Sequence, residues 1–228
     1  MTTPSLQPSI PAGNRADLGD RVVPVVMSSS RMRLALVDGF ASHQECVELI
    51  ALSLPTLSRS QVTLGADGAQ ATHAARDSDG TRHANDSAPL IAGIVARAAA
   101  LVGLPVEHAE PLGTLRYQNL QRYLPHLDWF SSADEAGQFQ LDQHGQRLAS
   151  VIIYLSDVEE GGSTAFPFLG LDVRAREGSA ICFANVGATG TPLREALHSG
   201  EPVVSGSKFV ATLWFRDRPY VSRGSAAP

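Results

Sequence analysis

Two residues one position apart, His126 and Asp128, could together hold a metal ion. In an extended segment, residues i and i+2 project to the same face, so this imidazole and this carboxylate would point the same way. They supply two of the three ligands of the facial triad that binds non-haem Fe(II) and leaves coordination positions open. The third ligand should be a histidine from a distant strand, and His198 is a candidate.

The segment Ser207–Phe215 carries a lysine that would need an anionic partner. In a strand, Lys208 would share one face with Thr212, and both faces would be largely apolar, so we expect the strand to be buried on both sides. A buried ammonium group is costly unless an anion meets it, and no carboxylate in this strand can do so. A bound dicarboxylate could, with the Thr212 hydroxyl as a further donor.

Each of these features is weak evidence by itself. Most H-x-D tripeptides are ordinary surface or core residues, a single histidine after a strand is usually a satisfied polar residue, and Lys208 could extend its ammonium group to the surface. The ordered set is more specific, because His198 follows Asp128 by 70 positions and Lys208 comes ten positions later. The set therefore favours a functional site over three unrelated residues.

Length and composition indicate a soluble globular protein. The chain has 228 residues, of which 43% are hydrophobic and 18% charged, and this suits one domain with a sizeable core. The net charge of −5 gives no basic footprint for nucleic acid or an anionic membrane. There is no apolar run of about 18 residues and no signal-peptide pattern. Cys46 and Cys182 lie in apolar contexts and are expected to be reduced core residues of a cytoplasmic protein.

The N-terminal segment differs in composition from the rest of the chain. It contains three early prolines and a run of serines, without an amphipathic period, so we expect a mobile or loosely attached arm over 1–31. A single domain is expected over 32–220, with a short tail at 221–228.

Two helices are predicted in the first half of this domain. Ser42 and Glu45 form the S-x-x-E pattern of a capping box ahead of an apolar period, and this helix should stop at Pro55. The second helix should begin near Pro89 and close at Gly103.

The segment between the two helices, Ser58–Ser87, is rich in Gly, Asp, Ser, Thr and His. A loop of this length inside a domain is usually functional or disordered. Arg76 and Arg82 lie within it, where they could close over a substrate or remain solvated charges.

From Pro111 onward the pattern changes to short strands separated by turns. Helices followed by strands of this spacing indicate a mainly β fold with flanking helices, in which a jelly-roll sandwich has the helices packed on one face. The predicted strands are Arg33–Phe40, Gly113–Gln118, Gln121–Asp128, Arg147–Leu155, Ser163–Phe166, Leu171–Arg174, Ser179–Ala184, Leu193–His198, Pro202–Ser205 and Ser207–Phe215.

These motifs resemble the catalytic domain of the prolyl 4-hydroxylase family, within the Fe(II)/2-oxoglutarate-dependent dioxygenases. The resemblance runs from about Leu34 to Tyr220 and keeps the order and spacing of the motifs. It implies a double-stranded β-helix (jelly-roll) core supported by N-terminal helices, with Fe(II), 2-oxoglutarate and O₂, and with ascorbate as reductant. One departure is Gln118-Asn119-Leu120, where the family often has a glycine-rich turn. The matching stretches are Glu110–Leu112 with Arg116–Tyr117, Gln121–Phe130, Gly145–Arg147, Tyr154–Val158, Gly161–Pro167, Leu197–Val203 and Gly206–Lys208 through Trp214.

The resemblance also implies roles for single residues. His126, Asp128 and His198 match the iron ligands, and Lys208 matches the partner of the far carboxylate of 2-oxoglutarate. The further candidates are Thr212 and Tyr117 as hydroxyl donors, Tyr154 and Trp214 as pocket-lining residues, and Arg147, Arg76 and Trp129 on the substrate side.

Several of these candidates have a structural interpretation as well. Tyr117, Tyr154 and Trp214 could pack in the core with a satisfied polar tip. Arg147 could equally be a solvated strand end.

The implied reaction is hydroxylation of an unactivated C–H bond, coupled to conversion of 2-oxoglutarate to succinate and CO₂. The leading hypothesis for the substrate is a prolyl residue of a peptide or protein, which needs an open groove beside the iron, bordered by the loops near 60–85 and 131–146. A hydroxylase of a free amino acid or other small molecule would have a closed pocket with a charged partner for the head group. A non-catalytic jelly-roll binding module is the third hypothesis, although it has no need for both the triad and Lys208.

Overall fold

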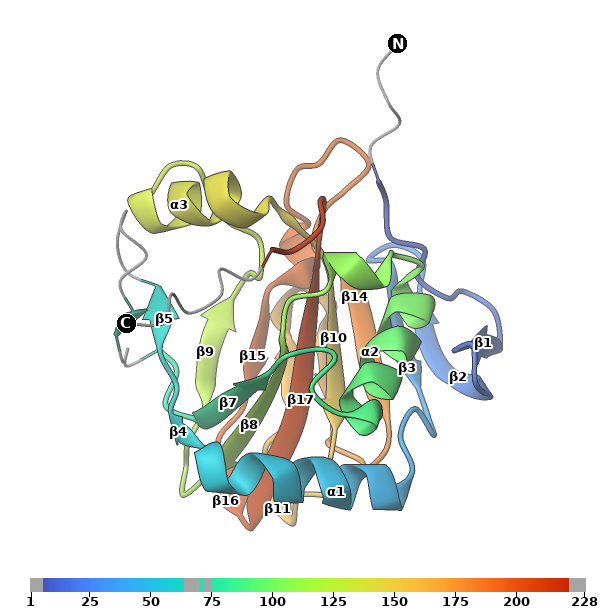
Figure 1. The fold of residues 1–228 in the computed structure, drawn as a ribbon, viewed down its shortest axis with the longest axis vertical. Helices are drawn as coiled ribbons and strands as arrows, with labels where there is room; N and C mark the ends of the chain where they lie inside the picture. Colours follow the sequence, from blue (N-terminus) through green and yellow to red (C-terminus); the bar gives the residue numbers. More distant parts are fainter. Residues whose placement is uncertain (1–5, 64–69, 72–74, 222–228) are drawn as a thin grey trace.

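In the computed structural model, two antiparallel sheets face each other and helices cover the outer side of the larger one (Figure 1). The structure describes residues 6–63, 70–71 and 75–221. The larger sheet has nine strands, which are, in spatial order, β1 (Arg15–Asp17), β2 (Val22–Ser29), β3 (Leu34–Val37), β14 (Ala180–Ala184), β10 (Arg147–Tyr154), β17 (Ser207–Arg216), β8 (Leu112–Gln118), β7 (Asp79–His83) and β4 (Ser58–Arg59).

The smaller sheet has four strands and carries two of the residues singled out above. Its order is β13 (Leu171–Val173), β12 (Thr164–Phe166), β15 (His198–Gly200) and β9 (Tyr123–His126). Two further antiparallel pairs are β11 (Glu160–Gly161) with β16 (Val203–Ser205), and β5 (Val62–Thr63) with β6 (Gln70–Ala71).

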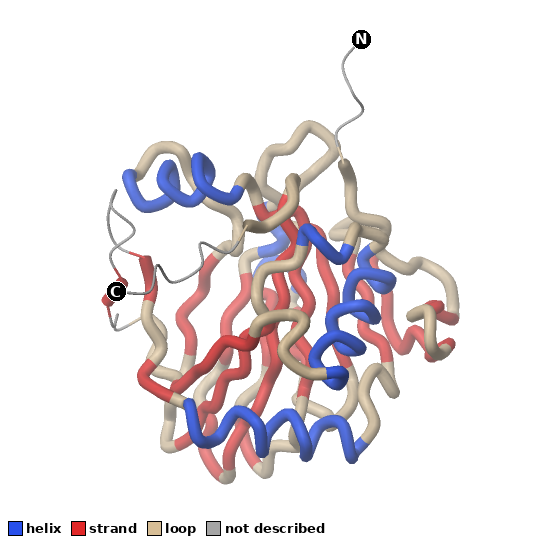
Figure 2. Tube along the Cα trace, viewed as in Figure 1, coloured by secondary structure: helices blue, strands red, loops and turns tan. Residues whose placement is uncertain are grey.

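The two predicted helices are confirmed, and both lie on the same side of the larger sheet (Figure 2). Helix α1 (His43–Ser53) begins with the capping box, in which the Ser42 backbone N–H donates to Glu45 Oε2 at 2.8 Å. Helix α2 (Pro89–Val102) ends at Gly103, whose φ of 62° is a conformation that glycine adopts without steric cost. Within the described part of the chain, no helix is long and apolar enough to cross a membrane.

Strand β17 separates two hydrophobic cores. On one face, Phe209, Ala211 and Leu213 pack with α2 and the helix-side core. On the other face, Val210 joins the core between the two sheets, together with Tyr117. The prediction that both faces of this strand are buried is therefore confirmed.

The prediction of a mobile arm over 1–31 is wrong for residues 15–17 and 22–29, which form β1 and β2. Strand β2 pairs with β3, and the buried side chains of Ala16, Leu18 and Val23 join the helix-side core. Pro24 does not prevent this, because it comes before Val25, the first residue of β2 that pairs with β3. Residues 1–5 and 222–228 of the predicted arm and tail lie outside the described residues.

Other local predictions also differ from the structure. Leu193–His198 is not a strand: residues Arg194–Ala196 form a 3₁₀ turn, and the strand begins only at His198. The stretch 131–146, predicted as a loop, contains helix α3 (Glu135–His144), whose first turn is capped by the Asp134 carboxylate accepting from the Gly137 N–H at 2.7 Å. The long loop before α2 contributes β7, which pairs with β8.

The turn between β8 and β9 is made without glycine. Asn119 and Leu120 have φ values of 54° and 65°, in the left-handed region that glycine favours. Although this turn lacks the glycines that the family often has there, Asn119 and Leu120 adopt the backbone conformation that glycine favours.

Cys46 and Cys182 are both buried and free, in agreement with the prediction of reduced core residues. The cytoplasmic location inferred partly from them stays a prediction.

Candidate active site

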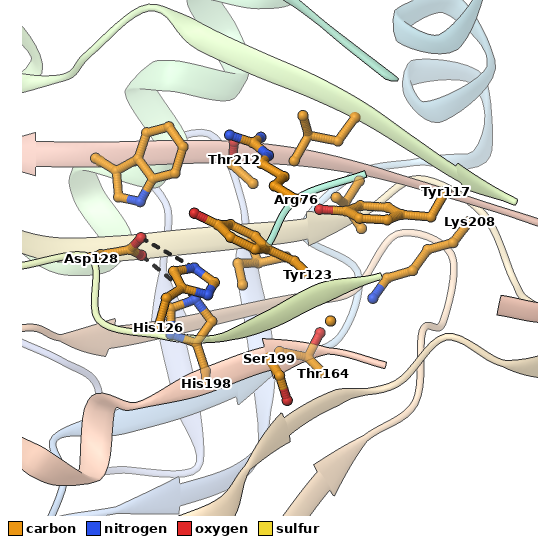
Figure 3. A pocket seen from close by; sticks show the side chains of 15 residues that line it. Arg76, Tyr117, Tyr123, His126, Asp128, Thr164, His198, Ser199, Lys208 and Thr212 are labelled. Atoms are coloured by element: carbon orange, nitrogen blue, oxygen red, sulfur yellow. Dashed lines mark ion pairs between the residues drawn. The ribbon is translucent and has the colours of Figure 1, made fainter. Parts of the chain in front are cut away.

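Two histidines from paired strands and an aspartate from the bend that follows one of them converge at one end of the smaller sheet (Figure 3). His126 ends β9, His198 begins β15, and the register places these two residues opposite each other. Asp128 follows two residues after His126, so its carboxylate returns to the same face. One ligand atom from each of the three lies within 4.8 Å of the others. The structure thus brings together the three residues that the sequence predicted as metal ligands.

Each histidine is held in the tautomer that a metal ligand needs. His126 Nδ1 lies 2.9 Å from the Leu124 carbonyl oxygen, and His198 Nδ1 lies 2.9 Å from the Ala196 carbonyl oxygen. Because a carbonyl oxygen only accepts, Nδ1 carries the hydrogen in both rings and Nε2 keeps its lone pair. Both Nε2 atoms lie 3.7 Å from an Asp128 carboxylate oxygen.

The environment keeps His126 neutral and Asp128 ionised. Burial, and next the neighbouring His198, lower the pKa of His126 to about 3. Burial alone would raise the pKa of Asp128, but His198, His126 and Arg147 together hold it below its usual range. Two imidazoles and one carboxylate form the donor set of a facial Fe(II) triad, so these residues fit that metal.

A second layer of side chains orients Asp128. Ser150 Oγ donates to Asp128 Oδ2 at 2.7 Å, and Asn185 Nδ2 donates to Ser150 Oγ at 2.9 Å. Ser150 lies on β10 in the larger sheet, so this contact spans the sandwich. The Tyr123 ring stacks on His126, with 3.6 Å between ring centroids.

A cavity beside the triad contains the predicted lysine. Lys208 is opposite Tyr117 in the register of β17 and β8, and both side chains line the cavity together with Thr212 and Trp214. Lys208 is 3% exposed, and among the described residues no acidic group forms an ion pair with it. Its Nζ atom has the Ser163 carbonyl oxygen at 3.5 Å. Burial lowers the pKa of Lys208 to about 8, and the charge of Glu201 offsets this only in part.

A residue that lines the same cavity has an unsatisfied polar atom. Thr212 Oγ1 is buried without a hydrogen-bond partner. A buried hydroxyl and a buried ammonium both lack a strong acceptor, and a carboxylate would supply one. The residues of the cavity therefore fit 2-oxoglutarate.

Tyr154 is placed differently from the prediction. It is fully buried, it does not line the cavity, and its hydroxyl donates to Thr164 Oγ1 at 2.9 Å. Thr164, which the sequence did not single out, is the residue of this pair that faces the cavity. Tyr154 therefore supports the wall from behind.

Arg147 is not a solvated strand end. Its Nε and Nη2 atoms donate to the two carboxylate oxygens of Glu110 at 2.6 and 2.9 Å, and its Cζ atom lies 3.9 Å from the centroid of a Trp214 ring. Arg216, which is 1% exposed, donates to the same carboxylate at 2.7 Å. Arg147 Nη1 also lies 3.8 Å from Asp128 Oδ1, so this buried cluster adjoins the triad.

An open cleft of about 520 Å³ runs along this cluster. The residues predicted to face the substrate, Arg76, Trp129 and Arg147, all line it. Arg82 lines it from β7, and residues of α3 such as Phe139 line the opposite side. The cleft therefore lies between the loop near 60–85 and the segment 131–146.

Comparison with known proteins identifies the family. Residues 112–216 match the model of the 2OG-Fe(II) oxygenase superfamily. Prolyl 4-hydroxylase 1 of Arabidopsis thaliana is 34% identical over 212 residues, which cover 86% of this chain and 73% of that protein. The chain belongs to the prolyl 4-hydroxylase family. Probable prolyl 4-hydroxylase 7 of the same plant is 32% identical over 206 residues, and the chain spans 64% of its length.

Solved structures give the same fold for this prolyl 4-hydroxylase-like chain. The viral collagen prolyl hydroxylase of Paramecium Bursaria Chlorella virus-1 has a TM-score of 0.62 and 26% identity, covering 79% of this chain and 94% of that one. A Pseudomonas putida prolyl-4-hydroxylase, at 18% identity, has a TM-score of 0.54 over 81% of this chain and 92% of its own, and supports the fold alone. The predicted jelly-roll core is confirmed.

Some residues of the site carried no signal of their own in the sequence. Tyr123, Ser150 and Asn185 belong to types that occur in any strand or turn, and only the folded sandwich brings them to the triad. Glu110 lay within a family-like motif, but its pairing with Arg147 and Arg216 depends on contacts between distant strands.

Replacing Ser150 by alanine should weaken metal binding about tenfold, because Asp128 loses the donor that fixes its carboxylate. Titration of the protein with Mn(II), or with Fe(II) without oxygen, measures this. Ser53→Ala removes another buried serine, on α1 and away from the site, and should bind metal like the wild type. Equal metal affinities for the Ser150 and Ser53 variants would contradict the assigned role.

Replacing Glu110 by glutamine should destabilise the fold by about 3 kcal/mol at neutral pH, because two buried arginines lose their charged partner. Burial alone would raise the pKa of Glu110, but Arg147 and Arg216 lower it to about 2, from 4.5. A carboxyl group whose pKa falls on folding stabilises the protein above its unfolded pKa and loses this contribution as the pH falls toward the folded pKa.

The free-energy difference between wild type and Glu110→Gln should therefore narrow as the pH falls from about 5 toward about 2. Urea unfolding at several pH values in this window measures the difference. Glu107→Gln, which removes an exposed carboxylate, is the matched control. A difference that stays constant with pH would show that Glu110 does not supply this pH-dependent stability.

Proposed function

We propose that this protein hydroxylates a prolyl residue of a peptide or protein, using Fe(II), 2-oxoglutarate and O₂, with ascorbate as reductant. The observation that carries the proposal is the meeting of the His126–Asp128–His198 triad, a cavity with an unpaired lysine, and an open cleft at one place. When bound, Fe(II) and 2-oxoglutarate supply the oxidising chemistry, in which 2-oxoglutarate becomes succinate and CO₂.

The chain's own residues bind and orient the reactants. His126, Asp128 and His198 hold the metal, and Ser150 keeps the Asp128 carboxylate turned toward it. Lys208 receives the far carboxylate of 2-oxoglutarate, since it is a buried cation of that cavity and forms no ion pair with an acidic group of the described residues. Thr212, whose hydroxyl has no partner, lines the same cavity and can donate to bound 2-oxoglutarate, and Tyr117 lies opposite Lys208 in the register of β17 and β8.

The apolar side chains of the cavity keep water from the reacting atoms. Ile152, Val210 and Leu115 line the cavity beside the triad, and Trp214 lies where the cavity meets the cleft. Trp214 is held between two cations, because Arg147 stacks on it at 3.9 Å and Arg82 lies 5.4 Å from its ring. A fixed indole at this position would close one wall over a bound substrate.

The open cleft favours a peptide over a free amino acid. A peptide needs space for residues on both sides of the one that reacts, and the cleft of about 520 Å³ extends from Asp128 to α3. Its borders are those expected for a peptide enzyme, with Gln61, Arg76 and Arg82 on one side and Ser131 to His144 on the other. The solved relative with a TM-score of 0.62 is itself named a collagen prolyl hydroxylase.

Succinate formation by the purified protein with Fe(II) and ascorbate tests the proposal. A panel of proline-containing peptides should stimulate turnover, and His126→Ala should abolish it, because the metal loses a ligand. Stimulation by free proline or other amino acids alone would favour the small-molecule reaction instead. Iron-independent or absent turnover under all conditions would favour a binding module.

Replacing Lys208 by methionine should weaken 2-oxoglutarate binding about 100-fold while leaving metal binding intact, because a charge-assisted contact worth about 3 kcal/mol is lost. Calorimetry with the Mn(II)-loaded protein measures both affinities.

Chemical labelling gives a second readout, since Lys208 is the only lysine in the chain. Bound 2-oxoglutarate should protect this one side chain from reductive methylation, as followed by mass spectrometry; unprotected labelling would contradict the assignment.

A further inference from the structure

A second cleft, of about 300 Å³, is lined by basic side chains and adjoins the site. Arg59, Arg76 and Arg82 line it, and no aspartate or glutamate of the described residues does. Its other polar lining consists of hydroxyls and one amide. The chain has a net charge of −5, so a cleft with three arginines and no acidic residue among those described does not reflect the overall composition. Such a cleft favours an anion.

This arginine cleft (Arg59, Arg76 and Arg82) is continuous with both parts of the site already described. It shares Arg76, Thr212 and Trp214 with the cavity beside the triad. It shares Arg76, Arg82 and Trp214 with the larger cleft that runs to α3. A substrate peptide that places one residue at the triad would therefore place a neighbouring residue close to the arginine cleft.

Arg82 is the arginine with the most freedom to bind a ligand. Half of its side chain is exposed, and its nearest carboxylate oxygen, Glu110 Oε2, is 3.9 Å away. Glu110 already accepts closer hydrogen bonds from Arg147 and Arg216, at 2.6 to 2.9 Å. Arg82 therefore shares its nearest carboxylate with two arginines that lie closer to it, and an added anion would give it a partner of its own.

The other two arginines are fixed at the walls of the cleft. Arg59 on β4 donates from Nη1 to the Asp77 carbonyl oxygen, which holds the side chain beside the loop. Arg76 is 9% exposed, its Nε atom has no hydrogen-bond partner, and its Cζ atom lies 5.2 Å from the Tyr123 ring centroid. The pairing of β4 with β7 brings Arg59 and Arg82 onto adjacent strands.

We propose that the arginine cleft binds an acidic side chain of the substrate, so that the preferred peptides carry aspartate or glutamate close to the residue that is hydroxylated. The proposal rests on the proposed function, because the acidic residue is taken to belong to a peptide whose target reaches the triad. The carboxylates of 2-oxoglutarate are the other source of the same chemistry. A peptide side chain fits better. Lys208 already supplies a cation for 2-oxoglutarate inside the cavity, and the arginine cleft is continuous with the larger cleft proposed to hold the peptide.

Four short peptides of one length separate the effect of charge from the effect of proline. They combine proline or alanine at the target position with glutamate or glutamine beside it, and each carries a fluorophore for anisotropy. Binding is measured with the full chain loaded with Mn(II) and 2-oxoglutarate, which requires no turnover. Succinate formation with Fe(II) is measured on the same peptides.

The glutamate peptides should bind about fivefold more tightly than the glutamine peptides at low ionic strength. This ratio should approach one at about 0.5 M salt, because the contact is electrostatic and partly exposed. Arg82→Gln should reduce the ratio to less than about twofold, since it removes the charge and leaves a shorter polar side chain. Arg31→Gln makes the same change at an 82% exposed arginine outside the cleft and should keep the ratio.

Equal binding of the glutamate and glutamine peptides would overturn the proposal. It would also be overturned if Arg82→Gln kept the ratio but weakened 2-oxoglutarate binding, because the cleft would then serve the co-substrate. Failure of the proposed function gives a different result: succinate formation would not distinguish proline from alanine, whereas the glutamate-to-glutamine binding ratio would stand.

Discussion

The pairing of β9 with β15 is the constraint on which the site depends. Its register sets His126 opposite His198, and each ring is then turned by a hydrogen bond from Nδ1 to the carbonyl oxygen two residues earlier. A slip of one residue would send one imidazole to the other face of the sheet. The third ligand adds a second requirement, because Ser150 reaches Asp128 from the opposite sheet. The triad therefore exists only when the register of the small sheet and the closure of the sandwich are both correct.

The two sides of the larger sheet contribute differently to this arrangement. The helix-side core is almost wholly apolar and contains α1, α2 and the outer face of β17, so it supplies hydrophobic stabilisation without any chemistry. The inner face of the larger sheet and the cleft beside it carry Lys208, Arg147 and Arg216, whose desolvation is costly. Glu110 compensates for the two arginines, and Lys208 is left for a bound anion. Binding of that anion to the folded state alone would add to the stability of the protein.

The sequence was informative where a residue's role follows from local geometry. The H-x-D spacing, the alternation of β17, the capping box at Ser42 and the stop at Gly103 each rest on the period of one element, and all are found in the structure. It was uninformative where a role depends on contacts between distant segments, as for Ser150 with Asp128. Helix α3 was missed because Gly137 is its one buried residue among those described, which leaves no amphipathic period to detect. The N-terminal strands were missed because prolines were given more weight than the few apolar residues that β1 and β2 bury.

The choice of lysine at position 208 follows from what each cation requires when it is buried. Every other Lys or Arg position of the chain is an arginine. An arginine has five donors in a fixed plane, which suits a carboxylate held by the protein itself, as in the two-point contact between Arg147 and Glu110. A lysine has three donors on a flexible stem, so fewer buried donors stay unsatisfied before a ligand arrives. Before a ligand binds, the ammonium group has weak cation–π contacts with the rings of Tyr117 and Tyr154. Their centroids lie 5.8 and 5.7 Å from Lys208 Nζ. A buried cation that pairs only with a bound dicarboxylate therefore costs less in the ligand-free protein as lysine than as arginine.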